Sequence, residues 1–350
     1  MKPLRIWLVG VGTVGTWLAT VLDSQRERLA ARYGLNPVIV GVASARGGFV
    51  YDSSGLDLAS VLAPPGDWPP GGRRGVRHWP STIDGLRATE ADLLVEVSAS
   101  PPGDGEPGVT HMREALQRRI PVVTSNKWPV ALRGVELAAQ ARAEGVAFRA
   151  ESTVMSGTPV LSALAEGLAG AQPAALRGLL NATANFILSR MADGSSYADA
   201  LAEAQRAGLA ERDPAADVEG HDAVAKVMIL SGLVFGRQLR REQVTVRGIT
   251  AITGQEIARA RSAGGRVKHV ATLGFDGPGG AGGVNGRVQP EFVRHNDPLA
   301  SVDGTANAVV FQASPVGQVT IIGPGAGPEL AGQGVLSDII AVASRRAGSS

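Results

Sequence analysis

An apolar segment followed at once by a glycine-rich turn constrains the fold of this chain more than any other feature. Residues 4–9 form an apolar run typical of a buried strand, and Gly10, Gly12 and Gly15 follow it with the spacing Gly-x-Gly-x-x-Gly. Residues 16–32 then carry leucine and valine at helical spacing, and a second apolar run comes next. Strand, glycine turn, helix and strand make one βαβ unit, so the chain is predicted to begin a parallel sheet.

The alternation of strand and helix patterns continues to about residue 150. Such an alternation is typical of a parallel, doubly wound α/β sheet with helices on both faces. The expected strands cover residues 38–43, 92–97, 120–127 and 146–150, and the expected helices cover residues 112–119 and 137–144. Residues 62–80 are rich in proline and glycine and are expected to form a loop.

The pattern changes after Glu151. Residues 244–249 and 267–273 indicate strand or helix pieces, and Lys268, two residues after Arg266, is expected on a surface helix. Because 350 residues exceed what one small core holds, two domains are expected. The second region is predicted to contain helices at 157–168, 196–207 and 218–233, a strand at 176–180 and a glycine-rich hairpin at 274–286.

Composition excludes several classes of function. The chain has no cysteine, so disulfides, thiolate metal sites and oxidation of an aldehyde through a thioester are impossible. Its arginines are scattered and only 4% of its residues are aromatic, which does not indicate nucleic-acid binding. No apolar run is long enough to span a membrane and no signal peptide is evident, so the expected location is the cytoplasm.

The glycine turn is suited to binding a dinucleotide. Gly10 would make the tight turn, Gly12 would let a pyrophosphate approach the backbone, and Gly15 would let the helix pack on the strand. The helix that begins near Thr13 and Val14 would then direct its N-terminus at the phosphates. The alternative is a purely structural turn, because many glycine motifs of this kind occur by chance.

The end of the second strand bears on the choice of dinucleotide. It contains no acid that could hold a ribose 2′-hydroxyl group, whereas Ser44 and Arg46 suit a 2′-phosphate. NADP is therefore favoured over NAD, and the alternative is that Arg46 is a solvated loop residue.

Lysine is scarce in this chain, since only four of its 34 basic residues are lysines. Arginine keeps its proton at any working pH, whereas lysine gives one up when its surroundings lower its pKa. Lys226 follows Asp222 by four residues and precedes an apolar helical run, so both side chains share one helix face. A lysine beside carboxylates at such a place is a candidate proton donor. Lys127, which ends the patterned residues 122–127, is singled out by the same scarcity. The alternative for Lys226 is an exposed ion pair of little consequence.

The acidic segment around Lys226 also contains Glu211, Asp213, Asp217 and Glu219. Carboxylates in such a cluster could bind Mg²⁺, although the histidines of the chain show no ligand spacing.

Eight segments in order along nearly the whole chain together resemble homoserine dehydrogenase. The most specific is Gly208–Lys226, which follows the pattern G-x-A-E-x-D-P-x-x-D-x-x-G-x-D-x-x-x-K. The others are the glycine turn, Thr-Ser-Asn-Lys at 124–127, E-x-x-V-x-x-G-x-P at 151–159, L-N-A-T-A-N-F-I-L at 180–188, and the segments 297–300, 307–309 and 323–327.

The resemblance implies a reversible reduction of L-aspartate 4-semialdehyde to L-homoserine by NAD(P)H, in threonine, methionine and isoleucine biosynthesis. It implies that Lys226 donates the proton and that Lys127 lies by the nicotinamide and the substrate. Glu211 would bind the substrate ammonium group. Asp222 would orient Lys226 or the substrate, and the pocket would be completed by Asp217 and Thr183.

The resemblance also implies further ligand contacts. Ser98, Lys127 and Gly327 would add to the cofactor site. A monovalent cation, Na⁺ or K⁺, would be held by backbone carbonyl groups, which map to Glu151, Val154, Ser156 and Thr158.

The architecture implied is a Rossmann domain at 1–150, completed by about 331–350, and a mixed α/β substrate-binding and dimerisation domain at 151–330. A homodimer is expected. The chain ends near Ser350 without room for a regulatory domain, so feedback by threonine through such a domain is not expected.

Three departures from the family pattern bear on specificity. Ala182 replaces a glycine beside Thr183, Ala184 replaces a common threonine, and His221 replaces a frequent apolar or aromatic residue. A dehydrogenase of another small amino or hydroxy acid is therefore one alternative. A non-catalytic NADP-binding sensor is another, but such a protein has no need of Lys127 and Lys226.

Overall fold

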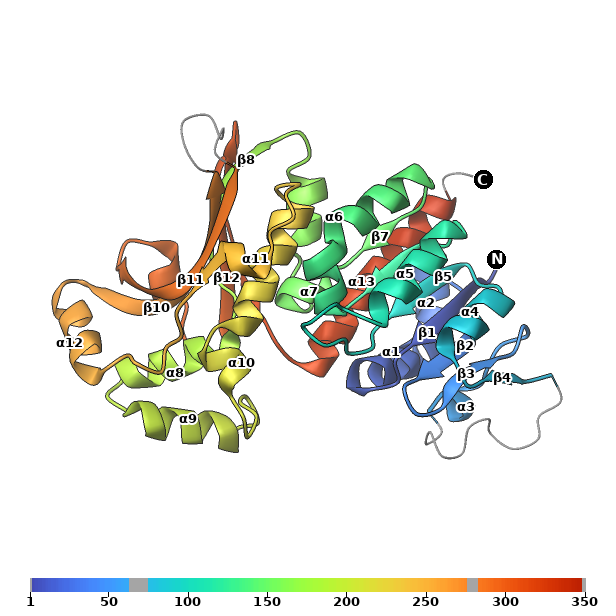
Figure 1. The fold of residues 1–350 in the computed structure, drawn as a ribbon, viewed down its shortest axis with the longest axis horizontal. Coiled ribbons are helices and arrows are strands. Elements are labelled where there is room, and N and C mark those ends of the chain that lie inside the picture. Colours follow the sequence, from blue (N-terminus) through green and yellow to red (C-terminus); the bar gives the residue numbers. More distant parts are fainter. Residues whose placement is uncertain (1, 63–74, 276–282, 348–350) are drawn as a thin grey trace. The chain divides into compact units, whose positions relative to one another are not determined.

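The structure is a computed structural model that describes residues 2–62, 75–275 and 283–347. The chain separates into two compact units, Met1–Gly157 with Gly327–Ser350, and Thr158–Ala326. Figure 1 shows the elements of both units, coloured along the chain.

The first unit contains a seven-stranded sheet in the order β4-β3-β2-β1-β5-β6-β7. The five strands from β2 to β7 are parallel, whereas β3 and β4 are antiparallel to their neighbours. The strands are β1 Leu4–Val9, β2 Pro37–Ser44, β3 Gly48–Tyr51, β4 Arg77–Trp79, β5 Leu93–Glu96, β6 Val122–Thr124 and β7 Phe148–Arg149. The predicted α/β fold is confirmed.

Both faces of this sheet are buried, which explains why β1 is apolar along its whole length. Ile6 and Leu8 pack in a core with helices α1 and α13, whereas Trp7 and Val9 pack in a second core with α4, α5 and α6. The helices of this unit are α1 Thr13–Ser24, α2 Arg26–Tyr33, α3 Leu58–Leu62, α4 Thr82–Ala88, α5 Gly108–Gln117, α6 Lys127–Ala143, α7 Ser152–Met155 and α13 Pro328–Ala347.

Helix α13, at the far end of the sequence, completes the first core beside α1 (Figure 1). Gly332 makes this approach possible, because a Cβ atom there would lie 2.1 Å from the ring of Trp17.

Several predicted elements of this unit differ from the structure. Residues 77–79 of the predicted loop form strand β4, and the helix predicted from residue 137 already begins at Lys127. The single helix predicted over 16–32 is two helices, because Gln25 leaves the helical conformation with φ −105° and ψ 14°. The strand predicted to reach Lys127 ends at Thr124, and Lys127 is instead the first residue of α6. Pro129 is compatible with this helix start, since proline is tolerated in a first turn where its missing N–H has no helical partner.

The second unit contains a six-stranded, mostly antiparallel sheet in the order β13-β12-β8-β10-β11-β9. Helices α8, α11 and α12 pack against its strands. The strands are β8 Gln172–Leu179, β9 Val244–Val246, β10 Gly265–Phe275, β11 Val284–Arg294, β12 Ala306–Ser314 and β13 Gly317–Pro324. The α-helices are α8 Ala182–Ala192, α9 Tyr197–Arg206, α10 Ala215–Val218, α11 His221–Leu233 and α12 Gly254–Ser262.

The predictions for the second unit were right for most elements. The helix predicted from residue 157 is a π-helical turn at Ala163–Gly167 with two helical residues before it. Strands β10 and β11 form the predicted hairpin, but its residues 276–282 lie outside the described part of the chain, as do residues 63–74 of the predicted loop.

Across the described ranges, no helix combines the length and apolar character that a membrane span requires.

Candidate active site

Lys226 lies in the middle of α11, a helix that is buried on nearly every side. Its Nζ atom is 3.0 Å from Oδ2 of Asp222 and donates a hydrogen bond of 2.6 Å to the carbonyl oxygen of Leu180. The side chains of Lys226 and Asp222 are only 8% and 14% exposed. The pair is therefore largely withdrawn from solvent, unlike the exposed ion pair that was the alternative.

Asn181 joins the two carboxylates of this site. It is the N-cap of α8, where its Oδ1 atom accepts a hydrogen bond of 2.8 Å from the backbone of Ala184. Its Nδ2 atom donates to Oδ1 of Asp217 at 2.7 Å and to Oδ2 of Asp222 at 3.2 Å. One amide group thus links a helix start to two acidic side chains about 40 residues away in the sequence.

The sequence analysis did not single out Asn181. An asparagine immediately before a predicted helix is a strong N-cap signal. That signal predicts the bond to Ala184, but it carries no information about the contacts with Asp217 and Asp222.

Thr183 is buried and follows Asn181 by two residues in the sequence. Its hydroxyl group donates a hydrogen bond of 2.8 Å to the carbonyl oxygen of Leu209. Glu211 is exposed on the loop after α9, and its backbone carbonyl accepts a hydrogen bond of 3.1 Å from Gln205 Nε2. The hydrogen bonds therefore bring Asp217, Asp222 and Lys226 together, but they do not include the side chain of Glu211.

The three departures from the family pattern occupy different environments. Ala184 in α8 is fully buried in the hydrophobic core against which this helix packs. Ala182, the first residue of the same helix, is 7% exposed. His221 begins α11, where its Nδ1 atom is 3.0 Å from an Nη atom of Arg241.

In the first unit, two of the three motif glycines are required by close packing. Gly10 has φ +103°, and a Cβ atom there would lie 2.6 Å from the backbone nitrogen of Ser98. A Cβ atom at Gly15 would lie 2.0 Å from the carbonyl oxygen of Gly10. Around a Cβ atom built at Gly12, by contrast, no atom of the described residues lies within 4 Å. The packing of the chain leaves open space at Gly12 that a bound group can occupy.

The N-terminus of α1 at this turn suits an anion. Gly12 is the N-cap, none of the described side chains caps the helix, and its first turn contains no acidic residue. Thr13 is exposed and Val14 packs partly against the core. Backbone N–H groups and the helix dipole at such an end attract phosphate groups.

Ser44 and Arg46 lie where β2 turns into β3. The Ser44 hydroxyl accepts a hydrogen bond of 2.9 Å from the backbone of Gly47, and Arg46 is exposed. Neither position conflicts with a phosphate ligand.

Ser98 and Lys127 follow the carboxyl ends of neighbouring strands β5 and β6. The Ser98 hydroxyl donates to Oε1 of Glu96, and Lys127 is partly buried. Gly327 belongs to the same unit and precedes α13 with φ +129°.

Glu151 and Ser156 flank the four-residue helix α7, which contains Val154, and Ser156 turns the chain after the helix with φ +52°. The carbonyl group of Glu151 accepts a hydrogen bond of 3.5 Å from the backbone of Val154. Carbonyl groups at the end of so short a helix, such as that of Val154, have no partner within the helix, and carbonyl oxygens are the kind of ligand that the proposed monovalent cation requires. Thr158 begins the second unit, where its hydroxyl donates to the carbonyl oxygen of Pro324 at 2.8 Å. Within the described residues, no group of three His, Asp or Glu side chains could hold a metal ion, which gives the Mg²⁺ alternative no support.

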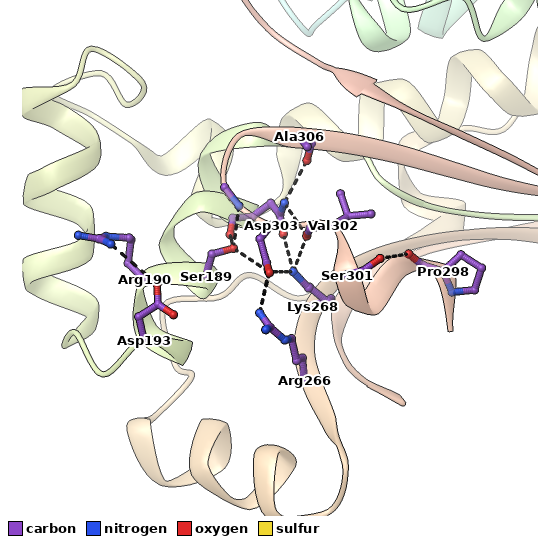
Figure 2. Close-up of polar contacts among 12 residues, drawn as sticks. Ser189, Arg190, Asp193, Arg266, Lys268, Pro298, Ser301, Val302, Asp303 and Ala306 are labelled. Atoms are coloured by element: carbon purple, nitrogen blue, oxygen red, sulfur yellow. Dashed lines mark hydrogen bonds and ion pairs between the residues drawn. The ribbon is translucent and has the colours of Figure 1, made fainter. Parts of the chain in front are cut away.

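Lys268 overturns the prediction of a surface helix. It lies in strand β10 with 1% of its surface exposed, and Figure 2 shows its ammonium group at the centre of a polar cluster. Its Nζ atom donates to Val302 O at 2.5 Å, Asp303 Oδ1 at 2.8 Å and Asn185 Oδ1 at 3.2 Å. The prediction failed because local periodicity cannot show that a buried ammonium group finds acceptors on distant segments.

The charges in this cluster act on one another. Burial lowers the pKa of Lys268, although the hydrogen bond and the charge of Asp303 oppose the shift. Burial alone would raise the pKa of Asp303, but Lys268 and Arg266 hold that pKa below its usual value. The carboxylate of Asp303 is therefore stabilised in its charged form.

Comparisons with known proteins agree on one family. The homoserine dehydrogenase family model matches residues 159–340. An NAD(+)-dependent homoserine dehydrogenase of Pseudomonas canavaninivorans is 38% identical over 97% of this chain and 96% of its own length. The crystal structure of a homoserine dehydrogenase from Thiobacillus denitrificans superposes with a TM-score of 0.81 at 34% identity, covering 99% of this chain and 75% of that one.

A third relative was solved with a ligand. A mutant of a hyperthermophilic archaeal homoserine dehydrogenase, in complex with NADPH, superposes with a TM-score of 0.79 at 28% identity and covers 98% of both chains. The family model, the sequence relatives and the structural neighbours coincide, and this chain belongs to the homoserine dehydrogenase family.

Proposed function

We propose that this protein catalyses the reversible NAD(P)H-dependent reduction of L-aspartate 4-semialdehyde to L-homoserine, a step of threonine, methionine and isoleucine biosynthesis. The observation that carries the proposal is the buried contact of Lys226 with Asp222, within a family defined by this activity. When bound, the nicotinamide cofactor supplies or accepts the hydride.

Lys226 is proposed as the proton donor in the reductive direction and the acceptor in the oxidative one. A carbonyl oxygen that gains a hydride becomes an alkoxide and needs a proton, which a positioned ammonium group provides. Asp222 holds that ammonium group on the same helix face, and Asn181 holds Asp222 through its Nδ2 atom. Lys127 is proposed as a second acid/base or electrostatic group on the cofactor side.

The remaining polar groups of the second unit are proposed to bind the amino-acid part of the substrate. Glu211 is exposed and can accept from an ammonium group. The Thr183 hydroxyl gives its proton to Leu209, so it can offer only lone pairs to a ligand. Asp217 is held by Asn181 and would support this pocket.

The first unit is proposed to bind the dinucleotide and the second to bind the substrate and form the dimer contact. Gly10, Gly15 and the start of α1 would shape the phosphate site, and the open space at Gly12 would admit the pyrophosphate. Thr13, Val14, Ser98 and Gly327 would complete it.

NADP is the preferred cofactor in this proposal. Ser44 and Arg46 occupy the position where an acid would select NAD, and Arg46 is exposed and able to reach a 2′-phosphate. Both cofactors occur among the relatives, since one relative is named NAD(+)-dependent and the structure of another, a mutant, is a complex with NADPH. Parallel measurement of kcat/KM for NADP and NAD decides between them, and Arg46→Ala should weaken NADP selectively.

A monovalent cation is proposed at the carbonyl groups of Glu151, Val154, Ser156 and Thr158. Replacing Na⁺ or K⁺ by choline at constant ionic strength should lower activity if the ion is needed. Equal activity in choline would remove this part of the proposal.

A homodimer in the cytoplasm is proposed as the working form. Among the described residues, four of the five exposed large apolar side chains belong to the second unit, namely Val246, Phe292, Val316 and Ile322. Exposed apolar side chains mark a contact surface where they form a contiguous patch. Sedimentation or light scattering would measure the mass in solution.

The decisive experiment for the activity is reduction of NADP and NAD with L-homoserine as substrate, alongside close analogues. Turnover of homoserine in preference to its analogues is expected. A protein that turns over neither homoserine nor the semialdehyde would not be a homoserine dehydrogenase.

A further inference from the structure

A buried carboxylate lies directly behind the proposed cofactor site. Glu96, the last residue of β5, has no exposed surface. Its Oε1 atom accepts a hydrogen bond from the Ser98 hydroxyl, and its Oε2 atom accepts one of 2.9 Å from Asn126 Nδ2. Neither the proton transfer nor the substrate contacts proposed above use this residue.

The orientation of the Asn126 amide follows from its other bonds. Its Oδ1 atom accepts from the backbone nitrogen of Ser100 at 3.2 Å. A backbone N–H can only donate, so this atom must be the oxygen, and the amide nitrogen must face Glu96. The same Nδ2 atom also donates to the Ser100 hydroxyl at 2.8 Å. Asn126 therefore presents a donor to Glu96 and cannot reverse without losing these contacts.

The polarity of Ser98 follows in turn. Ser98 Oγ is the donor in its hydrogen bond to Glu96 Oε1, so the single hydroxyl proton of Ser98 is directed at Glu96. Asn126 Nδ2 also points at the Ser98 oxygen, at 3.5 Å, which agrees with a hydroxyl whose proton is turned away. Only lone pairs of this oxygen remain for any other partner.

Ser98 stands beside the glycine turn and is partly exposed. Gly10 approaches it so closely that a Cβ atom would lie 2.6 Å from the Ser98 nitrogen. A ligand seated on the turn would lie near Ser98, whose hydroxyl group can only accept.

We propose that Glu96 is a positioning residue that makes Ser98 an obligate hydrogen-bond acceptor for an N–H or O–H donor on the nicotinamide-riboside half of the dinucleotide. The inference rests on the proposed function, which places Ser98 in the cofactor site. Glu96 itself would touch no ligand. It would affect cofactor binding only by fixing the direction in which the Ser98 hydroxyl group points its proton.

Glu96→Gln tests this polarity with little change of shape. Because Asn126 must donate, the new amide would turn its oxygen to Asn126 and its nitrogen to Ser98. Ser98 would then accept from residue 96 and direct its own proton at the ligand, where it meets another donor. The dissociation constant of NADPH, measured by fluorescence titration without turnover, should rise roughly tenfold or more. Glu96→Asp keeps a hydrogen-bond acceptor at this position and should change the dissociation constant of NADPH far less.

The double variant separates polarity from a general structural effect. Ser98→Ala should also weaken NADPH binding, and adding Glu96→Gln to it should cause no further loss, since no hydroxyl remains to reverse. Glu136→Gln, at an exposed carboxylate paired with Arg113, is the matched control and should bind normally. Thermal unfolding of each variant shows whether binding tracks stability.

The outcomes distinguish this inference from the proposed function. Unchanged binding in Ser98→Ala would remove Ser98 from the cofactor site and contradict that part of the proposed function. Weak binding in Ser98→Ala with normal binding in Glu96→Gln, or additive losses in the double variant, would overturn the role of Glu96.

Ligand analogues give a second test that does not depend on folding of the Glu96 variants. The 3-acetylpyridine dinucleotide lacks the carboxamide N–H donors, and deoxy forms lack a ribose hydroxyl on the nicotinamide side. The wild-type protein should discriminate against at least one of them, and Ser98→Ala should lose that discrimination. Equal discrimination by both proteins would overturn the acceptor role.

Discussion

Lys226 and Asp222 face each other across one turn of a buried helix, with Nζ and Oδ2 3.0 Å apart. A charged pair in such surroundings is expected to be functional or strongly supported, because removing two charges from water is costly. Asn181 and the Leu180 carbonyl provide that support. The arrangement leads to the first prediction.

Lys226→Ala should lower kcat by about 10²- to 10⁴-fold, the usual contribution of a general acid or base, while NADPH affinity stays close to normal. Lys226→Arg restores a positive charge but does not release its proton, so it should also fail. Steady-state kinetics with parallel NADPH titration measures both effects. Activity within tenfold of the wild type in the arginine variant would contradict a proton-transfer role.

Asn181 both caps helix α8 and donates to two carboxylates, and two substitutions separate these functions. Asn181→Ser keeps an N-cap oxygen for Ala184 but loses the donor to Asp217 and Asp222, so kcat should fall and the free energy of unfolding should drop by about 1–3 kcal/mol, the cost of a lost hydrogen bond to a charged group. Asn181→Ala loses both and should cost about 1–2 kcal/mol in addition. Urea unfolding and kinetics on the two variants provide the measurement. If the serine variant is fully active, the links to the carboxylates are not needed for catalysis.

The motif glycines should respond differently to a single methyl group. Gly15→Ala places a Cβ atom 2.0 Å from the Gly10 carbonyl oxygen and should lower the melting temperature. Gly12→Ala meets no atom of the described residues within 4 Å and should leave the melting temperature nearly unchanged, yet weaken NADPH binding. Normal binding in the Gly12 variant would argue for a structural turn.

Lys268 should matter for stability. Lys268→Met removes the ammonium group and leaves Asp303, Asn185 and a backbone carbonyl without their donor, at a cost of about 3 kcal/mol in the free energy of unfolding. Arg266→Met, at the more exposed partner of Asp303, is the control and should cost less than about 1 kcal/mol. Chemical denaturation of both variants is the measurement, and equal losses would show that burial is not decisive.

Asp338 in α13 should make stability depend on pH. Its carboxylate accepts from Arg149 Nε at 2.7 Å and from the Glu151 backbone at 2.9 Å, but burial still raises its pKa to about 6. The folded state therefore holds a proton that the unfolded state releases near pH 4, so this contribution to stability is present below about pH 4 and is lost as the pH rises to about 6.

The loss amounts to about 3 kcal/mol at most, and Asp338→Asn should abolish it. The difference between the unfolding free energies of the two proteins, followed from pH 4 to pH 7 in urea, isolates the contribution. A difference that does not vary with pH in this range would contradict the raised pKa.

Much of the architecture could be predicted from local pattern alone. The apolar run of β1 and the glycines after it predict a parallel sheet, because burial on both faces and a tight turn each leave a clear mark on neighbouring residues. The boundary at Lys127 was wrong, since the polar residues after Thr124 can continue a strand or start a helix. Contacts with the rest of the unit decide between the two.

The sequence by itself determined the fold class, the glycine turn and the pairing of Asp222 with Lys226, because four residues along a helix always share one face. Only the tertiary structure decided that Asn181 joins Asp217 to Asp222, that Lys268 is buried among acceptors, and that Glu96 directs the hydroxyl of Ser98. The first and second of these depend on segments distant in the chain, and the third depends on the amide of Asn126, the N-cap of α6 after strand β6. Hydrogen bonds of this kind form only when packing has placed donor and acceptor within about 3 Å, and no local periodicity encodes that distance.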